Sequence, residues 1–112
     1  METKLLNDLA HELHATSVSK GFYDDTDMTL FSEQCQRLAL IHSEVTEILE
    51  ALRKHKGSLE VVKEISDVLV RTLDFYEAMR EAGAVTESLD EVFHGIKEAN
   101  KGRPHLHGNL RG

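Results

Sequence analysis

The chain has 112 residues and a formal net charge of −7, a length typical of a single domain. It contains no apolar run near the ~20 residues of a membrane-spanning helix, and an acidic chain binds a nucleic-acid backbone poorly. We therefore expect neither membrane nor nucleic-acid partners. The single cysteine, Cys35, precludes an intramolecular disulfide, and no secretory leader pattern opens the chain. These features favour a cytoplasmic protein.

Glycines divide the sequence into four segments, each with the apolar spacing of an amphipathic helix. The first predicted helix covers about residues 2–19. After a loop that contains Phe22 and Tyr23, the second covers about residues 30–54. Its predicted inward stripe is Leu38, Ile41, Val45, Ile48, Leu49 and Leu52.

A short turn leads into the third predicted helix, about residues 59–82, and the fourth covers about residues 87–100. The inward residues expected on these two helices are Ile65, Val68, Leu69, Thr72, Leu73, Tyr76, Leu89, Val92, Phe93 and Ile96. Strand alternation is absent, so we predict one all-α domain over residues 1–112, an antiparallel bundle of four-helix type. So short a helical chain often completes its core by oligomerising.

Charge is distributed unevenly along these segments. Residues 1–93 carry 9 basic and 19 acidic side chains, a balance of −10, whereas residues 94–112 carry 4 and 1, a balance of +3. The tail over residues 101–112 is polar and basic and contains the only proline, Pro104.

Two pairs of acids, each spaced i, i+3, lie on the second and third predicted helices: Glu44 with Glu47, and Glu64 with Asp67. At about 100° per residue, each pair borders the apolar stripe of its helix. Counted from the turn, the two pairs lie within about 3 Å of the same height. We therefore expect four carboxylates to converge, and all-oxygen ligands suit Mg²⁺, with Mn²⁺ as a substitute. The plainer alternative is two solvated acidic helix faces.

Several short motifs run along nearly the whole chain. They are Gly21-Phe22-Tyr23-Asp24; Leu40-Ile41-His42-Ser43-Glu44-Val45-Thr46-Glu47 with Glu50-Ala51-Leu52-Arg53; Glu64-x-x-Asp67 with Val68-Leu69-Val70-Arg71-Thr72-Leu73-Asp74; and Lys97-Glu98-Ala99-Asn100-Lys101-Gly102-Arg103-Pro104 with His107-Gly108. This ordered set resembles the MazG-like all-α nucleoside triphosphate pyrophosphohydrolases.

The resemblance implies hydrolysis of a nucleoside triphosphate between its α and β phosphates, giving a monophosphate and diphosphate. It implies Mg²⁺ held by Glu44, Glu47, Glu64 and Asp67, in a dimer or dimer of dimers with active sites near subunit interfaces. A deoxynucleotide such as dCTP, dUTP or dGTP is the expected substrate, in cleansing or shaping of the nucleotide pool.

Several residues receive roles beside that metal site. One carboxylate must accept a proton from the attacking water, and we assign this to Glu47, although the sequence does not separate it from Glu44. Lys97, Asn100 and Arg103 can bind phosphate oxygens, or can simply complement a helix C-terminus.

Residues around the loop and the acids have two interpretations each. Phe22 and Tyr23 either stack on a base or cover the thin core. His42 is a supporting residue of the metal site or a packing residue. Arg71, four residues after Asp67, is a supporting residue of the metal site. Asp74 is a further supporting residue or pairs with Arg71.

Two further expectations concern residues outside these motifs. His11 and His14 form an i, i+3 pair that predicts an exposed helix face more strongly than a metal pair. Cys35 is expected in the core.

Two other functions remain open. One is a relative with another substrate, such as the phosphoribosyl-ATP pyrophosphatases, which share the fold, although the segment from Asn100 to His107 resembles the MazG-like group more closely. The other is a non-catalytic helical dimerisation or adaptor module.

Overall fold

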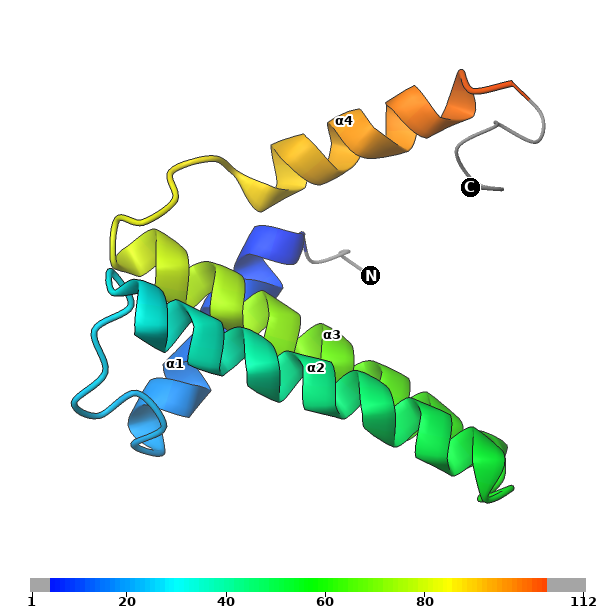
Figure 1. The fold of residues 1–112 in the computed structure, drawn as a ribbon. Coiled ribbons are helices and arrows are strands. Elements are labelled where there is room, and N and C mark those ends of the chain that lie inside the picture. The colour runs from blue at the N-terminus through cyan, green and yellow to red at the C-terminus, as the bar shows by residue number, and fades with distance from the viewer. Residues whose placement is uncertain (1–4, 105–112) are drawn as a thin grey trace.

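A computed structural model describes residues 5–104 as four helices with no strand in that range (Figure 1). They are α1 (Leu6–Ser19), α2 (Phe31–Arg53), α3 (Ser58–Glu81) and α4 (Leu89–Lys101). The prediction of an all-α fold is confirmed over these residues, whereas the four-helix type of bundle stays a prediction. The expected helical residues 2–4 and the end of the basic tail, residues 105–112, lie outside the described residues.

The long helices α2 and α3 form an antiparallel hairpin, and α3 is the central helix because it packs against both α1 and α2. The turn between them contains two residues with positive φ, His55 at 51° and Gly57 at 97°. Glycine adopts this conformation without steric cost, which explains the sharp reversal at Gly57. The boundaries of α2 and α3 lie within one residue of the predicted ones.

Helix α1 crosses the hairpin near the end where α2 begins and α3 finishes. Helix α4 follows at that same end, passes near the start of α1 and diverges from the hairpin (Figure 1). Asp90 of α4 accepts hydrogen bonds from the free backbone N–H groups of Leu6 and Asn7 at 2.7 and 3.1 Å. The Asn7 side chain in turn accepts from the Asp90 N–H at 3.0 Å. This reciprocal capping fixes the start of α4 on the start of α1.

Helix α4 begins at Leu89, two residues later than predicted, because Ser88 caps it and accepts a hydrogen bond from the Glu91 N–H at 3.3 Å. The connection from α3 is held by Tyr76, whose hydroxyl donates to the Glu87 carbonyl at 2.8 Å and accepts from the Leu89 N–H at 3.1 Å.

The core of one chain is small. Among the described residues, the buried apolar side chains are Ala10, Met28, Ala51 and Ala78. The expectation of a thin core therefore agrees with the fold.

The expected inward stripes are largely exposed, which corrects the sequence prediction. More than 40% of the surface is accessible on Leu38, Val45, Leu49, Leu52, Ile65, Leu69, Val92, Phe93 and Ile96. The prediction holds at the expected residues that are partly covered: Ile41, Ile48, Val68, Leu73, Tyr76 and Leu89. The protected positions of α2 and α3 also include residues outside the predicted stripes: Glu44, Ala51, Val61 and Glu64. Helical periodicity identifies an apolar face but does not say which element covers it.

Candidate metal and nucleotide site

Three of the four predicted metal ligands come together between α2 and α3. Carboxylate oxygens of Glu44, Glu64 and Asp67 all lie within 4.8 Å of one another. Glu44 faces the seam between the helices, where 19% of its side chain is exposed. We call these three residues the carboxylate triad.

The triad forms because the tight turn at Gly57 makes α2 and α3 antiparallel and places the two acid pairs at the same height. Glu44 and Glu64 both occupy protected positions of the helix seam, and Asp67 lies one turn further along α3. The sequence predicts each acid pair at the border of the apolar stripe of its helix. Because much of that stripe is exposed, the acids lie closer to the contact between α2 and α3 than predicted.

Glu47 is exposed and lies outside the triad. The negative charge of Glu47 is one of the causes that raise the pKa of Glu64 above its usual value of 4.5. The causes, largest first, are desolvation, a hydrogen bond with Glu60, and repulsion from Asp67, Glu60 and Glu47. The cluster therefore carries an excess of negative charge.

Arg71 is the one basic side chain that forms an ion pair with the triad within residues 5–104. Its Nε lies 2.9 Å from Oε1 of Glu44, across the helix seam. We expected Arg71 to pair with Asp67 or Asp74 on its own helix. Pairing with Asp74 does not form within the described residues, since His14 and Ser17 engage Asp74. The contact with Glu44 instead places Arg71 beside the carboxylate triad, where the supporting role expected for it stays a prediction.

Next to the triad lies a pocket of about 320 Å³ between the Gly21–Asp27 loop, α2 and α3. Phe22 and Tyr23 line it, and 63% of Phe22 is exposed. The remaining lining residues are Arg37, Leu40, Ile41, Arg71, Asp74 and Phe75. The pocket therefore combines aromatic and aliphatic walls with two guanidinium groups and one carboxylate.

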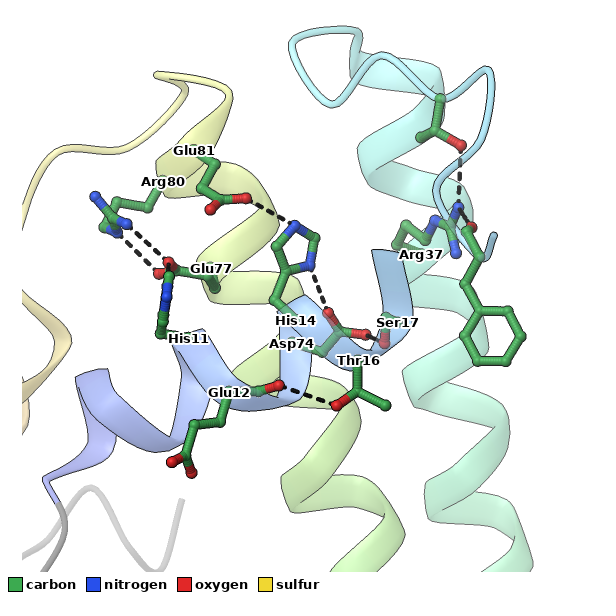
Figure 2. A network of polar contacts seen from close by, with 12 residues as sticks. His11, Glu12, His14, Thr16, Ser17, Arg37, Asp74, Glu77, Arg80 and Glu81 are labelled. Carbon is green, nitrogen blue, oxygen red and sulfur yellow. Dashed lines mark hydrogen bonds and ion pairs between the residues drawn. The ribbon is translucent and has the colours of Figure 1, made fainter. Parts of the chain in front are cut away.

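The loop that carries these aromatic residues is fixed by Arg37. Its Nη2 donates to the Phe22 carbonyl at 2.7 Å and to the Thr26 hydroxyl at 3.1 Å (Figure 2). The guanidinium also lies over the Tyr23 ring, 4.2 Å from its centroid. Burial and the neighbouring charge of Asp74, opposed by Arg37, raise the pKa of Tyr23 to about 12.

His14 forms the support beneath the pocket, which the sequence did not reveal. The ring is 5% exposed, and Figure 2 shows it between two carboxylates: Nδ1 lies 2.7 Å from Asp74 and Nε2 lies 3.0 Å from Glu81. Ser17 donates to the other oxygen of Asp74 at 2.7 Å. The expectation of an exposed histidine face is therefore wrong at His14.

A second polar cluster joins α1 to α3. Glu77 is 2% exposed, accepts two hydrogen bonds from Arg80 at 2.8 and 2.7 Å, and lies 3.1 Å from Nδ1 of His11 (Figure 2). Arg80 is the main reason that the pKa of Glu77 is lowered; burial opposes this shift and His11 adds to it. Since His11 stays largely exposed, the expectation of a polar helix face holds at that residue.

The predicted phosphate ligands do not meet the triad within one chain. Lys97, Asn100 and Arg103 are exposed on and after α4. Helix α4 packs mainly on α1 and meets the hairpin at its first residue, where Leu89 donates to Tyr76 (Figure 1). Lys97 lines a separate shallow pocket with Phe93, His94 and the first residues of α1.

Two other predicted residues lie apart from the site. The His42 ring is exposed and forms no hydrogen bond or ion pair with any residue in the described range, so it does not support the triad there. Cys35 is exposed as well, so the prediction of a core cysteine is wrong.

Comparisons with protein families, curated proteins and solved structures gave no match to this chain. Among the described helices, none has the length and hydropathy required to cross a membrane.

The donor set of the triad fits a hard divalent cation. Three carboxylates offer oxygen ligands within 4.8 Å of each other. Desolvation first, and then the neighbouring acids Asp67, Glu60 and Glu47, raise the pKa of Glu64. Mg²⁺ prefers such oxygen ligands and leaves coordination positions for substrate phosphates.

Proposed function

We propose that the protein is a Mg²⁺-dependent nucleoside triphosphate pyrophosphohydrolase that converts a nucleoside triphosphate and water to a monophosphate and diphosphate. The observation that carries the proposal is the convergence of Glu44, Glu64 and Asp67 beside a pocket with aromatic walls. The type of reaction is inferred from the resemblance of the motifs to the MazG-like nucleoside triphosphate pyrophosphohydrolases. A deoxynucleotide such as dCTP, dUTP or dGTP is the proposed substrate, and nucleotide-pool cleansing or shaping in the cytoplasm is the proposed role.

In this proposal Glu44, Glu64, Asp67 and the nearby Glu47 hold the metal. Bound Mg²⁺ supplies charge neutralisation for the triphosphate and acidifies water. Glu47 takes the proton of the attacking water because it lies outside the triad and keeps a free oxygen. A P–O bond to water forms, the bridging P–O bond breaks, and monophosphate and diphosphate leave.

The nucleoside end of the substrate fits the pocket. Phe22 is the better stacking partner, because most of its surface is free whereas Tyr23 is packed between His14 and Arg37. The His14 and Tyr23 rings meet edge to face with centroids 4.7 Å apart. Tyr23 therefore forms a fixed wall, and Phe22 adjusts to the base.

The active unit in this proposal is a homodimer or a homotetramer. Exposed leucine, isoleucine and valine side chains on α2 and α3 form an apolar face too extensive for an isolated chain. We propose that a second copy covers this face and that its α4 lies near the triad. Lys97, Asn100 and Arg103 of that copy then reach the phosphates that they do not reach in their own chain.

The same apolar face favours the second candidate, a non-catalytic helical dimerisation module. A nucleotide assay separates the two functions. The purified protein is incubated with each NTP and dNTP in Mg²⁺ or in EDTA, and the products are resolved by ion-exchange chromatography. Monophosphate plus diphosphate formed only with Mg²⁺ supports the enzyme. A nucleoside diphosphate plus orthophosphate would contradict this reaction. No turnover of any nucleotide, together with no stabilisation of the protein by Mg²⁺, would favour the dimerisation module.

A further inference from the structure

Arg71 stands at the junction of the triad and the pocket. Its Nε lies 2.9 Å from Glu44, while the same side chain lines the pocket with Tyr23 and Asp74. The two terminal nitrogens of the guanidinium make no hydrogen bond to any residue in the range 5–104, and 49% of the side chain is exposed. Arg71 therefore keeps donors that are available to a ligand in the pocket that it lines.

The contact with Glu44 is easily exchanged. It is a single Nε contact rather than a two-pronged one, and half-exposed ion pairs of this kind are weak. Asp74, which lies three residues further along α3, is not an alternative partner because His14 and Ser17 hold both of its oxygens. Glu44 would hold Arg71 less strongly if it also held a divalent cation, because the cation would compete for the carboxylate and repel the guanidinium.

A nucleotide with its base in the pocket and its polyphosphate at the triad must pass Arg71, and the first phosphate after the sugar is the α-phosphate. We infer that Arg71 exchanges Glu44 for the α-phosphate when metal and nucleotide bind. The inference rests on the proposed function and adds a substrate-binding residue to it. A planar guanidinium suits this position because it can donate two parallel hydrogen bonds to a phosphate.

The inference is tested by two binding measurements on the intact chain. Mn²⁺ binding without nucleotide is followed by electron paramagnetic resonance. Binding of α,β-imido or α,β-methylene analogues of dCTP, dUTP, dGTP and ATP is then measured by calorimetry in saturating Mn²⁺. The variants are Arg71→Gln and Arg71→Lys. Arg53→Gln is the matched control, since Arg53 pairs with Glu50 on the exposed side of α2.

We expect Arg71→Gln to bind Mn²⁺ about threefold more tightly, because a competing cation is removed. The same variant should bind the best analogue about tenfold more weakly, because the phosphate loses its guanidinium. Arg71→Lys should keep the wild-type Mn²⁺ affinity and bind the analogue with intermediate strength. Arg53→Gln should change neither affinity.

Two results would overturn the inference while the proposed function stands. In both, the wild type binds Mn²⁺ and hydrolyses nucleotides. In the first, Arg71→Gln has the wild-type affinity for Mn²⁺ and for the analogue; in the second, both affinities are weaker. The second pattern would indicate a structural role for Arg71. A wild-type protein that binds no Mn²⁺ would overturn the proposed function, and the inference with it.

Discussion

Glu64 is the residue at which the crowding of negative charge is most evident. Desolvation and the neighbouring acids raise its pKa, so folding disfavours its ionised form. The stability that protonation of Glu64 provides is fully present below the ordinary carboxyl pKa of 4.5 and is lost as pH rises through the raised value. At neutral pH the metal-free protein therefore contains a destabilising carboxylate.

The first prediction is that Glu64→Gln raises the melting temperature of the metal-free protein at neutral pH, because the repulsion is removed. The difference from wild type should disappear below the ordinary carboxyl pKa. Mg²⁺ should stabilise the wild type but not the variant. Glu50→Gln is the control for differential scanning fluorimetry, since it removes an acid that already pairs with Arg53. A variant that melts below wild type at neutral pH would contradict this account of the triad.

The second prediction concerns Glu47. Replacing it by Gln keeps the shape of the side chain but removes the proton acceptor, so turnover should fall by about 10²–10⁴-fold. The melting temperature should change little because Glu47 is exposed. Circular dichroism with steady-state kinetics measures both quantities. Turnover close to wild type would eliminate Glu47 as the base and leave Glu44 as the remaining candidate.

At the scale of the helices, the hairpin was the most predictable part of the chain. Glycines mark the ends of α2 and α3, and matched heights on an antiparallel pair were sufficient to bring Glu44, Glu64 and Asp67 together. The links between helices were not predictable. The burial of His14 depends on Asp74, 60 residues away, and Arg71 pairs across the seam rather than along its own helix. No local spacing encodes such contacts.

The third prediction belongs to α4. If Lys97, Asn100 and Arg103 bind phosphate at the site of a second copy, two inactive variants should complement each other. Glu47→Gln and Arg103→Ala are mixed under conditions that allow subunits to exchange. Half of the dimers then carry one copy of each variant and one intact site, so activity should recover to about a quarter of wild type.

A mixture no more active than its components would show that α4 does not complete the site of a second copy. Lys56→Glu mixed with Glu47→Gln is the matched control, because Lys56 lies in the α2–α3 turn, away from α4. The Lys56→Glu variant keeps its carboxylates and its α4 intact and should therefore be active by itself. The increase above the summed activities should therefore be confined to the Arg103→Ala mixture.

For the whole molecule, the sequence predicted the apolar faces but not what covers them. Leu49 and Leu69 were expected to be inward, yet 54% and 60% of their surfaces are exposed in one chain. An isolated chain would leave this area in contact with water, at a cost of about 25 cal/mol per Å². A second copy can remove that cost, which links the thin core to the proposed assembly.

The fourth prediction is that the wild type is a dimer or tetramer and that Leu49→Glu shifts it to monomer. A charged side chain in the covered face would be buried without a partner. Light scattering after size-exclusion chromatography measures the mass, and Lys56→Glu serves as a charge-changing control at the exposed turn. A monomeric wild type at micromolar concentration would contradict the assembly.

The central claim is that the carboxylates of α2 and α3 support metal-dependent hydrolysis of a nucleoside triphosphate. Its most direct test is diphosphate release in Mg²⁺, compared between wild type, Glu64→Gln and the surface control Glu50→Gln. We predict stoichiometric monophosphate and diphosphate from the wild type and Glu50→Gln, and none from Glu64→Gln. Equal release by all three proteins, or no release by the wild type with any nucleotide, would contradict the claim.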